Sequence, residues 1–240
     1  MFRIPVLFVL ALATARPAVG QGAAPPVVEV RTLCFRHASA LADLEADDAR
    51  PEVITRCTLP LSMLSAPVRI APIMGKIAFY EKAPAADAKI RPEPLAVAEI
   101  PAKFQRVILF FLPNDSPDSG RLYKVVVLND DPRVFTPGGM LVCNLFADDV
   151  RFIVGEHKQM LRPGGIAYLK TPAERDDFNM AVVAFQFRAG ETWRTTSESK
   201  FRFVEPMRHL LFTYVDPSTR RPRIKTYRDV PAPVIEPGGT

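Results

Sequence analysis

The chain has 240 residues, with 31 Lys and Arg against 26 Asp and Glu, and its formal net charge is +5. The positive charge is small and scattered, which argues against nucleic-acid binding because that function usually needs a clustered basic face. Hydrophobic residues make up 48% of the chain, enough for one large or two ordinary cores, and 24 prolines disfavour long helices.

Residues 1–20 have the pattern of a secretory signal peptide. Arg3 gives a basic start, residues 4–13 are apolar, and the small residues 18–20 precede Gln21. The apolar run is too short for a membrane span, which needs about 20 residues. We therefore expect export to the periplasm or beyond, with cleavage before Gln21 and no transmembrane segment in the mature chain.

After this segment, short apolar stretches rich in Val, Ile, Phe and Thr alternate with Pro, Gly, Asn and Asp, as in sandwiches and barrels. The fold class predicted is all-β. Residues 37–49 fit either a helix or a mobile acidic loop. The predicted strands are 27–35, 53–59, 67–71, 75–81, 95–100, 105–112, 121–128, 139–146, 150–154, 164–170, 178–188, 192–204, 207–215 and 222–228.

Two Pro-Gly-Gly triplets, 137–139 and 163–165, each precede an apolar run. Proline favours the first central position of a type II turn, and glycine supplies the positive φ of the second. A phosphate-binding loop would need a following helix, which neither triplet has. We predict two type II turns.

The chain also contains a repeated pattern. Residues 106–110 (RVILF) match 208–212 (RHLLF), and Asp130 matches Asp229 further on. The offsets of 102 and 99 residues are close to the length of one immunoglobulin-like sandwich. An internal duplication would explain this match, although two unrelated hairpins of similar composition would also share such residues.

The expected architecture is two immunoglobulin-like β-sandwiches, covering 27–116 and 117–230, between flexible segments at 21–26 and 231–240. If the repeat is real, each sandwich should have its own core. We then expect Ile108 and Phe110 to lie together in the core of the first sandwich, and Leu210 and Phe212 to lie at the equivalent place in the core of the second.

Three cysteines remain after export: Cys34, Cys57 and Cys143. The first two lie on the apolar faces of predicted strands, and an oxidising compartment would permit a disulfide between them, with Cys143 left over. Three buried free thiols are the alternative, because unpaired cysteine is among the most buried residue types.

No established catalytic motif occurs in the sequence. The histidines 37, 157 and 209 are far apart, so neither a metal site nor a Cys143–His157 nucleophile pair is favoured. The acidic loops 114–120 and 129–131 could bind Ca²⁺, but their residues are also those of ordinary turns. We therefore expect no metal, no cofactor and no catalytic residue.

Two surface features are candidates for binding. Trp193 is the only tryptophan; it would stack on a sugar ring or anchor a partner protein if exposed, or cover the edge of a core if not. The basic group Arg220, Arg221, Arg223 and Lys225 is expected to be a solvated hairpin rather than an anion site.

The segment 127–145, with Asn129-Asp130-Asp131-Pro132 and Pro137-Gly138-Gly139, together with 208–212, resembles uncharacterised exported bacterial β-sandwich proteins. The resemblance implies export and an immunoglobulin-like fold, and it implies no catalytic residue. We expect an exported, non-enzymatic protein that binds another cell-envelope component, either a protein or a glycan. The alternative is an envelope hydrolase or metal-dependent enzyme whose site is assembled from loops.

Overall fold

The computed structural model describes residues 25–50, 53–85, 88–114, 116 and 120–231. The expected signal peptide with its cleavage site, most of the segment 21–26, and the tail after Pro231 lie outside these residues. The described part contains sixteen strands and no helix, which confirms the all-β class. It accordingly offers no helix that could cross a membrane.

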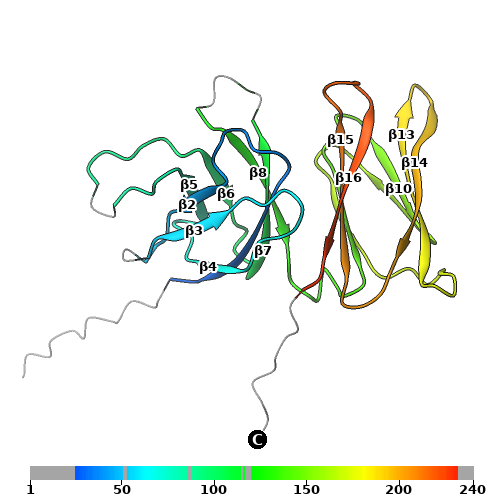
Figure 1. Ribbon diagram of the computed structural model, residues 1–240, viewed down its shortest axis with the longest axis horizontal. Coiled ribbons are helices and arrows are strands. Elements are labelled where there is room, and N and C mark those ends of the chain that lie inside the picture. The colour runs from blue at the N-terminus through cyan, green and yellow to red at the C-terminus, as the bar shows by residue number, and fades with distance from the viewer. Residues whose placement is uncertain (1–24, 51–52, 86–87, 115, 117–119, 232–240) are drawn as a thin grey trace, which may run out of the picture.

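The strands form two sandwiches that lie side by side, with the first on the left of Figure 1. The first comprises β1 (Val28–Cys34), β2 (Asp43–Ala46), β3 (Thr55–Thr58), β4 (Val68–Ile70), β5 (Lys76–Tyr80), β6 (Ala96–Glu99), β7 (Arg106–Pro113) and β8 (Tyr123–Asn129). The second comprises β9 (Met140–Asn144), β10 (Val150–Val154), β11 (His157–Leu161), β12 (Ile166–Leu169), β13 (Met180–Ala189), β14 (Thr192–Arg202), β15 (Arg208–Val215) and β16 (Pro222–Asp229).

The second sandwich repeats the topology of the first. Sheet 1 has the order β4-β1-β7-β8 and sheet 2 the order β3-β2-β5-β6; sheet 3 is β12-β9-β15-β16 and sheet 4 is β11-β10-β13-β14. Each strand of sheets 3 and 4 thus takes the place of the strand eight positions earlier. Strand β1 pairs in parallel with β7, as β9 does with β15, and the other pairs are antiparallel. The repeat expected from the sequence is present in the architecture.

This strand order differs from that of the immunoglobulin sandwich, in which the first strand shares a sheet with the second, fourth and fifth. Here the first strand lies between the fourth and the seventh, and the second lies between the third and the fifth. The two-sandwich expectation is confirmed, and the immunoglobulin-like arrangement is not.

The chain passes from one sandwich to the other in residues 130–139. The sequence analysis placed this boundary at 116/117, before β8. However, β8 pairs with β7 from Val107–Asn129 to Pro113–Tyr123, and Tyr123 is buried in the core of the first sandwich. The boundary is therefore corrected to the segment after β8.

Two strands, β2 and β11, were not expected from the sequence. Because β2 lies within 37–49, the helix considered there is wrong: Leu44 and Ala46 point into the core while Asp43 is exposed. Strand β11 has a single buried residue, Leu161, at its end. Four or five mostly polar residues are too few to show alternation, so pairing with neighbouring strands decides both conformations.

The two Pro-Gly-Gly triplets form the predicted turns. The amide of Gly139 donates to the carbonyl of Thr136 (3.0 Å), and Gly165 N–H donates to the carbonyl of Arg162 (2.8 Å). Gly138 and Gly164 have φ values of 73° and 72°, which the second central position of a type II turn requires.

Within the described residues, three apolar clusters form the interior. The first lies between sheets 1 and 2, the third lies between sheets 3 and 4, and the second lies between sheets 1 and 3, where the sandwiches meet. Along β7, Leu109 and Phe111 enter the first cluster while Ile108 and Phe110 enter the second. Sheet 1 is therefore buried on both faces.

The expectation that the two pairs of repeated side chains lie in two different cores was wrong. Ile108, Phe110, Leu210 and Phe212 all belong to the second cluster. A shared core would by itself argue against a duplication, yet the strand order repeats. Both facts hold because the equivalent outer faces of sheets 1 and 3 pack on each other.

Candidate functional site

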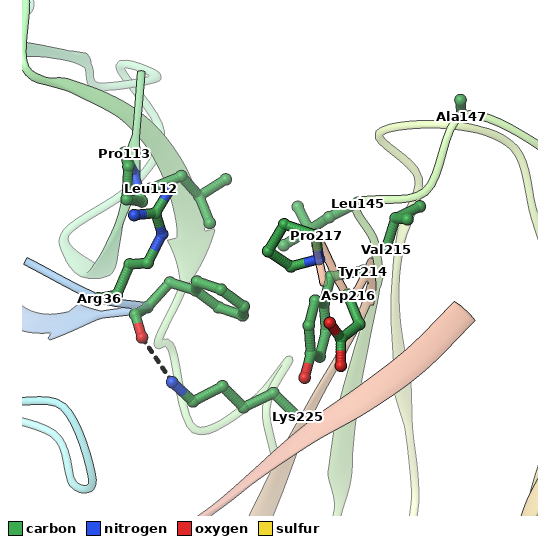
Figure 2. A pocket seen from close by; sticks show the side chains of 11 residues that line it. Arg36, Leu112, Pro113, Leu145, Ala147, Tyr214, Val215, Asp216, Pro217 and Lys225 are labelled. Carbon is green, nitrogen blue, oxygen red and sulfur yellow. Dashed lines mark hydrogen bonds between the residues drawn. The ribbon is translucent and has the colours of Figure 1, made fainter. Parts of the chain in front are cut away.

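A cleft of about 750 Å³ opens between the two sandwiches, at the ends of β1 and β7 on one side and of β9 and β15 on the other (Figure 2). We call it the inter-sandwich cleft. Its lining residues are Phe35, Arg36, Leu112, Pro113, Leu145, Ala147, Tyr214, Val215, Asp216, Pro217 and Lys225. Its size and mostly apolar lining are typical of small-ligand sites.

The two walls of the cleft come from equivalent places in the repeat. The amide of Phe35 donates to the carbonyl of Phe111 (2.9 Å), and the amide of Leu145 donates in the same way to that of Thr213 (3.1 Å). Phe35 and Leu145 are thus equivalent, and each is the residue directly after the first strand of its sandwich, β1 or β9. The ring of Phe35 meets that of Tyr214 edge to face, with centroids 4.9 Å apart.

Lys225 of β16 supplies a cation to this apolar site. Its Nζ donates a hydrogen bond to the carbonyl of Phe35 and lies 4.4 Å from the centre of the Phe35 ring. The side chain is half-buried, and burial lowers the pKa of its ammonium group. In Figure 2 it lies at the bottom of the cleft, and its ammonium group reaches the wall formed by the first sandwich.

Asp216 is the carboxylate of the cleft, and the turn that follows β15 already engages it. It accepts hydrogen bonds from the hydroxyl of Ser218 (2.6 Å) and from the amides of Ser218 (2.9 Å) and Thr219 (3.2 Å). These bonds, led by the hydroxyl of Ser218, lower the pKa of Asp216. Its role in the structure is to form this turn.

At the opposite end of the interface, a buried ion network joins the sandwiches. Arg208 bonds to Asp229 of its own hairpin and to Asp130, which directly follows β8 of the first sandwich, at 2.7 Å for the Asp130 contact. Arg31, also of the first sandwich, bonds to Asp229 at 2.6 Å. Arg208 and both aspartates are almost fully buried.

Burial acts to raise the pKa of both aspartates. For Asp130 burial prevails, and its pKa is raised. For Asp229 the hydrogen bond from Arg31 and the charges of Arg208 and Arg31 prevail, and its pKa is lowered. Together with the shared apolar cluster, this network fixes the relative position of the sandwiches, so the cleft is preformed.

A second hollow of about 910 Å³ lies between the edge strands β14 and β16. Lys200, Arg202 and Arg228 line it. Charged side chains on edge strands commonly protect unpaired backbone groups from other chains, so these cations have a structural explanation.

Trp193 does not line the inter-sandwich cleft. It lies on β14 in sheet 4, is half-buried, and packs against the guanidinium of Arg151 at 4.3 Å from its ring centre. One face of the indole is thus already occupied by a cation, which fits the edge-of-core alternative better than an open sugar platform.

In the structure all three cysteines are buried free thiols, and no bridge joins Cys34 to Cys57. These two residues do lie in the same cluster, between sheets 1 and 2, whereas Cys143 lies in the cluster between the sandwiches. Burial raises the pKa of Cys34 to about 11, and those of Cys57 and Cys143 to about 12.

The histidines stay separate. His37 Nε2 lies 2.7 Å from the carbonyl of Leu59, and His209 Nε2 lies 2.9 Å from that of Arg202, while His157 lies beside Glu156. Within the part of the chain that the structure describes, no three His, Cys, Asp or Glu residues are placed to hold a metal ion.

The acidic loops act as turns where they are described. Asp131 binds Arg133 through both carboxylate oxygens, and Asp130 belongs to the ion network. The loop 114–120 lies largely outside the described residues.

The sequence analysis missed the separate role of Lys225, because it grouped this residue with three arginines as a solvated hairpin. The repeat itself contains the signal that could have found it. Phe110 pairs with Val126, and its counterpart Phe212 pairs with Lys225. A lysine thus replaces a valine at an equivalent inward position, which is unusual for a merely solvated charge.

Comparison with known proteins found no protein-family model and no curated protein sequence that matches this chain.

Proposed function

We propose that this chain is an exported, non-enzymatic protein that binds another component of the cell envelope in its inter-sandwich cleft. The observation that carries the proposal is the cleft itself: a largely apolar hollow with a few polar groups, held open between two sandwiches that are locked together. The pattern of residues 1–20 supports export.

The polar groups of the cleft favour binding over hydrolysis. Asp216 is engaged by its turn, Arg36 is already engaged in another interaction, and Lys225 and Tyr214 stand among apolar side chains. A hydrolytic site would bring together a nucleophile or metal ligands with a general base, and the residues that line this cleft include neither histidine nor cysteine.

The test is capture of envelope components by the purified mature protein, compared with a variant whose cleft is obstructed. Ala147 is exposed and lines the cleft, so Ala147→Trp should fill its mouth without disturbing the core. Ala102→Trp, at the opposite end of β7, is the matched control. We expect a specific partner that Ala147→Trp loses and Ala102→Trp retains. Equal capture by both variants would refute the proposal.

A further inference from the structure

The two walls of the inter-sandwich cleft are formed by equivalent positions of the two sandwiches. Each lining residue of one sandwich can therefore be compared with its counterpart in the other. Phe35 and Leu145 are counterparts, as are Leu112 and Tyr214, and all four line the cleft, so both walls are apolar or aromatic. Lys225 departs from this symmetry, because its counterpart in the first sandwich is Val126. The fold therefore accepts an apolar residue at this position, and the cation needs another explanation.

The ammonium group of Lys225 is only partly satisfied. It has three N–H donors, and the described residues supply one acceptor for it, the carbonyl of Phe35. The salt bridges of the described chain do not include a carboxylate for Lys225. Aromatic rings flank it instead, with its Nζ 4.4 Å from the Phe35 ring centre and 5.5 Å from that of Tyr227. A half-buried cation without an acidic partner favours an anion at its free side.

From this arrangement we infer that the cleft takes a small apolar ligand that ends in a carboxylate, such as an acyl carboxylate, with Lys225 holding the carboxylate. This inference rests on the proposed function and names the class of ligand. A volume of about 750 Å³ suits a ligand of drug or medium-chain lipid size. Arg36 is a second cation that lines the cleft, but it is already engaged in another interaction. The ammonium of Lys225 is then the charge left for a ligand and matches a monoanion, whereas phosphate sites generally use several donors or an arginine fork.

The lining also argues against an extended peptide in this cleft. A peptide brings an amide at every residue, and each buried amide without a partner is costly. The cleft is lined mainly by Leu, Pro, Phe and Val side chains, which cannot satisfy amides. An alkyl chain brings no polar group apart from its end.

The test compares decanoate with decanol, which share the alkyl chain and differ in the charged end. Binding to the purified protein is measured by isothermal titration calorimetry. We expect decanoate to bind at least about tenfold more tightly than decanol, the factor that one charge-assisted hydrogen bond provides. Lys225→Met keeps the length of the side chain and should remove this preference without weakening decanol.

Lys158→Met is the matched control, because Lys158 is an exposed lysine of β11 that does not line the cleft. It should retain the preference for decanoate. Ala147→Trp should weaken both ligands. Thermal unfolding checks that each variant is folded, and Lys225→Gln replaces Lys225→Met if the latter is not.

Equal binding of decanoate and decanol by the unmodified protein, or absence of binding by both, would overturn the inference, as would an unchanged preference in Lys225→Met. If Ala147→Trp still loses an envelope partner in that case, the proposed function stands without this ligand class. Failure of the capture experiment, in contrast, would remove the proposed function.

Discussion

The rings of Phe110 and Phe212 stack across the boundary between the two sandwiches, with centroids 3.9 Å apart and planes inclined by 17°. These residues are equivalent in the repeat: Phe110 lies on β7 of sheet 1 and Phe212 on β15 of sheet 3, and these two sheets pack on each other. The repeated sequence therefore makes contact with itself, and the two sandwiches share one apolar cluster rather than behaving as independent domains.

This contact predicts that substitutions at the two positions are coupled. Phe110→Ala and Phe212→Ala should each reduce the free energy of unfolding by about 3–5 kcal/mol. Because each ring packs on the other, the double variant should lose less than the sum, with a coupling energy of about 0.5–3 kcal/mol. Urea unfolding of all four proteins measures this cycle.

Phe79, in the cluster between sheets 1 and 2, gives the control pair. Phe79→Ala combined with Phe212→Ala should be additive, since the two side chains belong to different clusters. Additive losses for Phe110 and Phe212 would mean that their stacking contributes nothing.

Arg208 should be important for stability, since its guanidinium forms ion pairs with two buried carboxylates, those of Asp130 and Asp229. Arg208→Met leaves Asp130 and Asp229 without this cation and should cost about 3–5 kcal/mol. Arg133→Met is the control: Arg133 pairs with Asp131 at the surface, where such a pair contributes at most about 1 kcal/mol. Equilibrium urea unfolding would contradict the role of Arg208 if both variants lost the same small amount.

Glu156 should make the protein sensitive to acid. Its carboxylate accepts hydrogen bonds from the amides of Ala173 (2.8 Å) and Glu174 (3.1 Å), and the first of these is the main reason that its pKa falls to about 2. Because the folded pKa lies below the usual value of 4.5, this contribution to stability is present above pH 4.5 and is lost as the pH falls towards 2.

Thermal unfolding between pH 7 and pH 2 measures this effect. Glu156→Gln should flatten the profile in that range, while Glu198→Gln, on the exposed side of β14, should not. Identical profiles for the two variants would exclude the hydrogen bonds of Glu156 as the cause.

The three thiols should be unreactive in the folded protein. Their pKa values of about 11 to 12 leave little thiolate at pH 8, and burial prevents access. Iodoacetamide at pH 8 should therefore modify all three cysteines in denaturant and none under native conditions within the same time. Cys34 and Cys57 that resist alkylation in unreduced, denatured protein would instead show that they are joined.

Processing at the N-terminus is a prediction from the sequence alone. The basic start, the apolar run and the small residues 18–20 predict cleavage before Gln21. Intact-mass measurement of protein from the envelope fraction should give the chain from Gln21 onwards. A mass that includes residues 1–20 would show that the segment is retained.

Local patterns in the sequence determined much of this architecture. Alternating apolar residues predicted most strands, Pro-Gly-Gly predicted both type II turns, and the match of 106–110 with 208–212 predicted the repeat. These features depend on backbone preferences and on spacing within a few residues, so a single sequence is enough to show them.

Only the tertiary structure decided what each apolar face covers. Alternation shows that Phe110 and Phe212 lie on the opposite face of the strand from the residues next to them. It does not show which other sheet packs on that face. It likewise left Cys34 and Cys57 as candidates for a bridge and Lys225 as a solvated charge. Contacts between residues a hundred positions apart depend on how the two sandwiches pack, and that packing also creates the cleft.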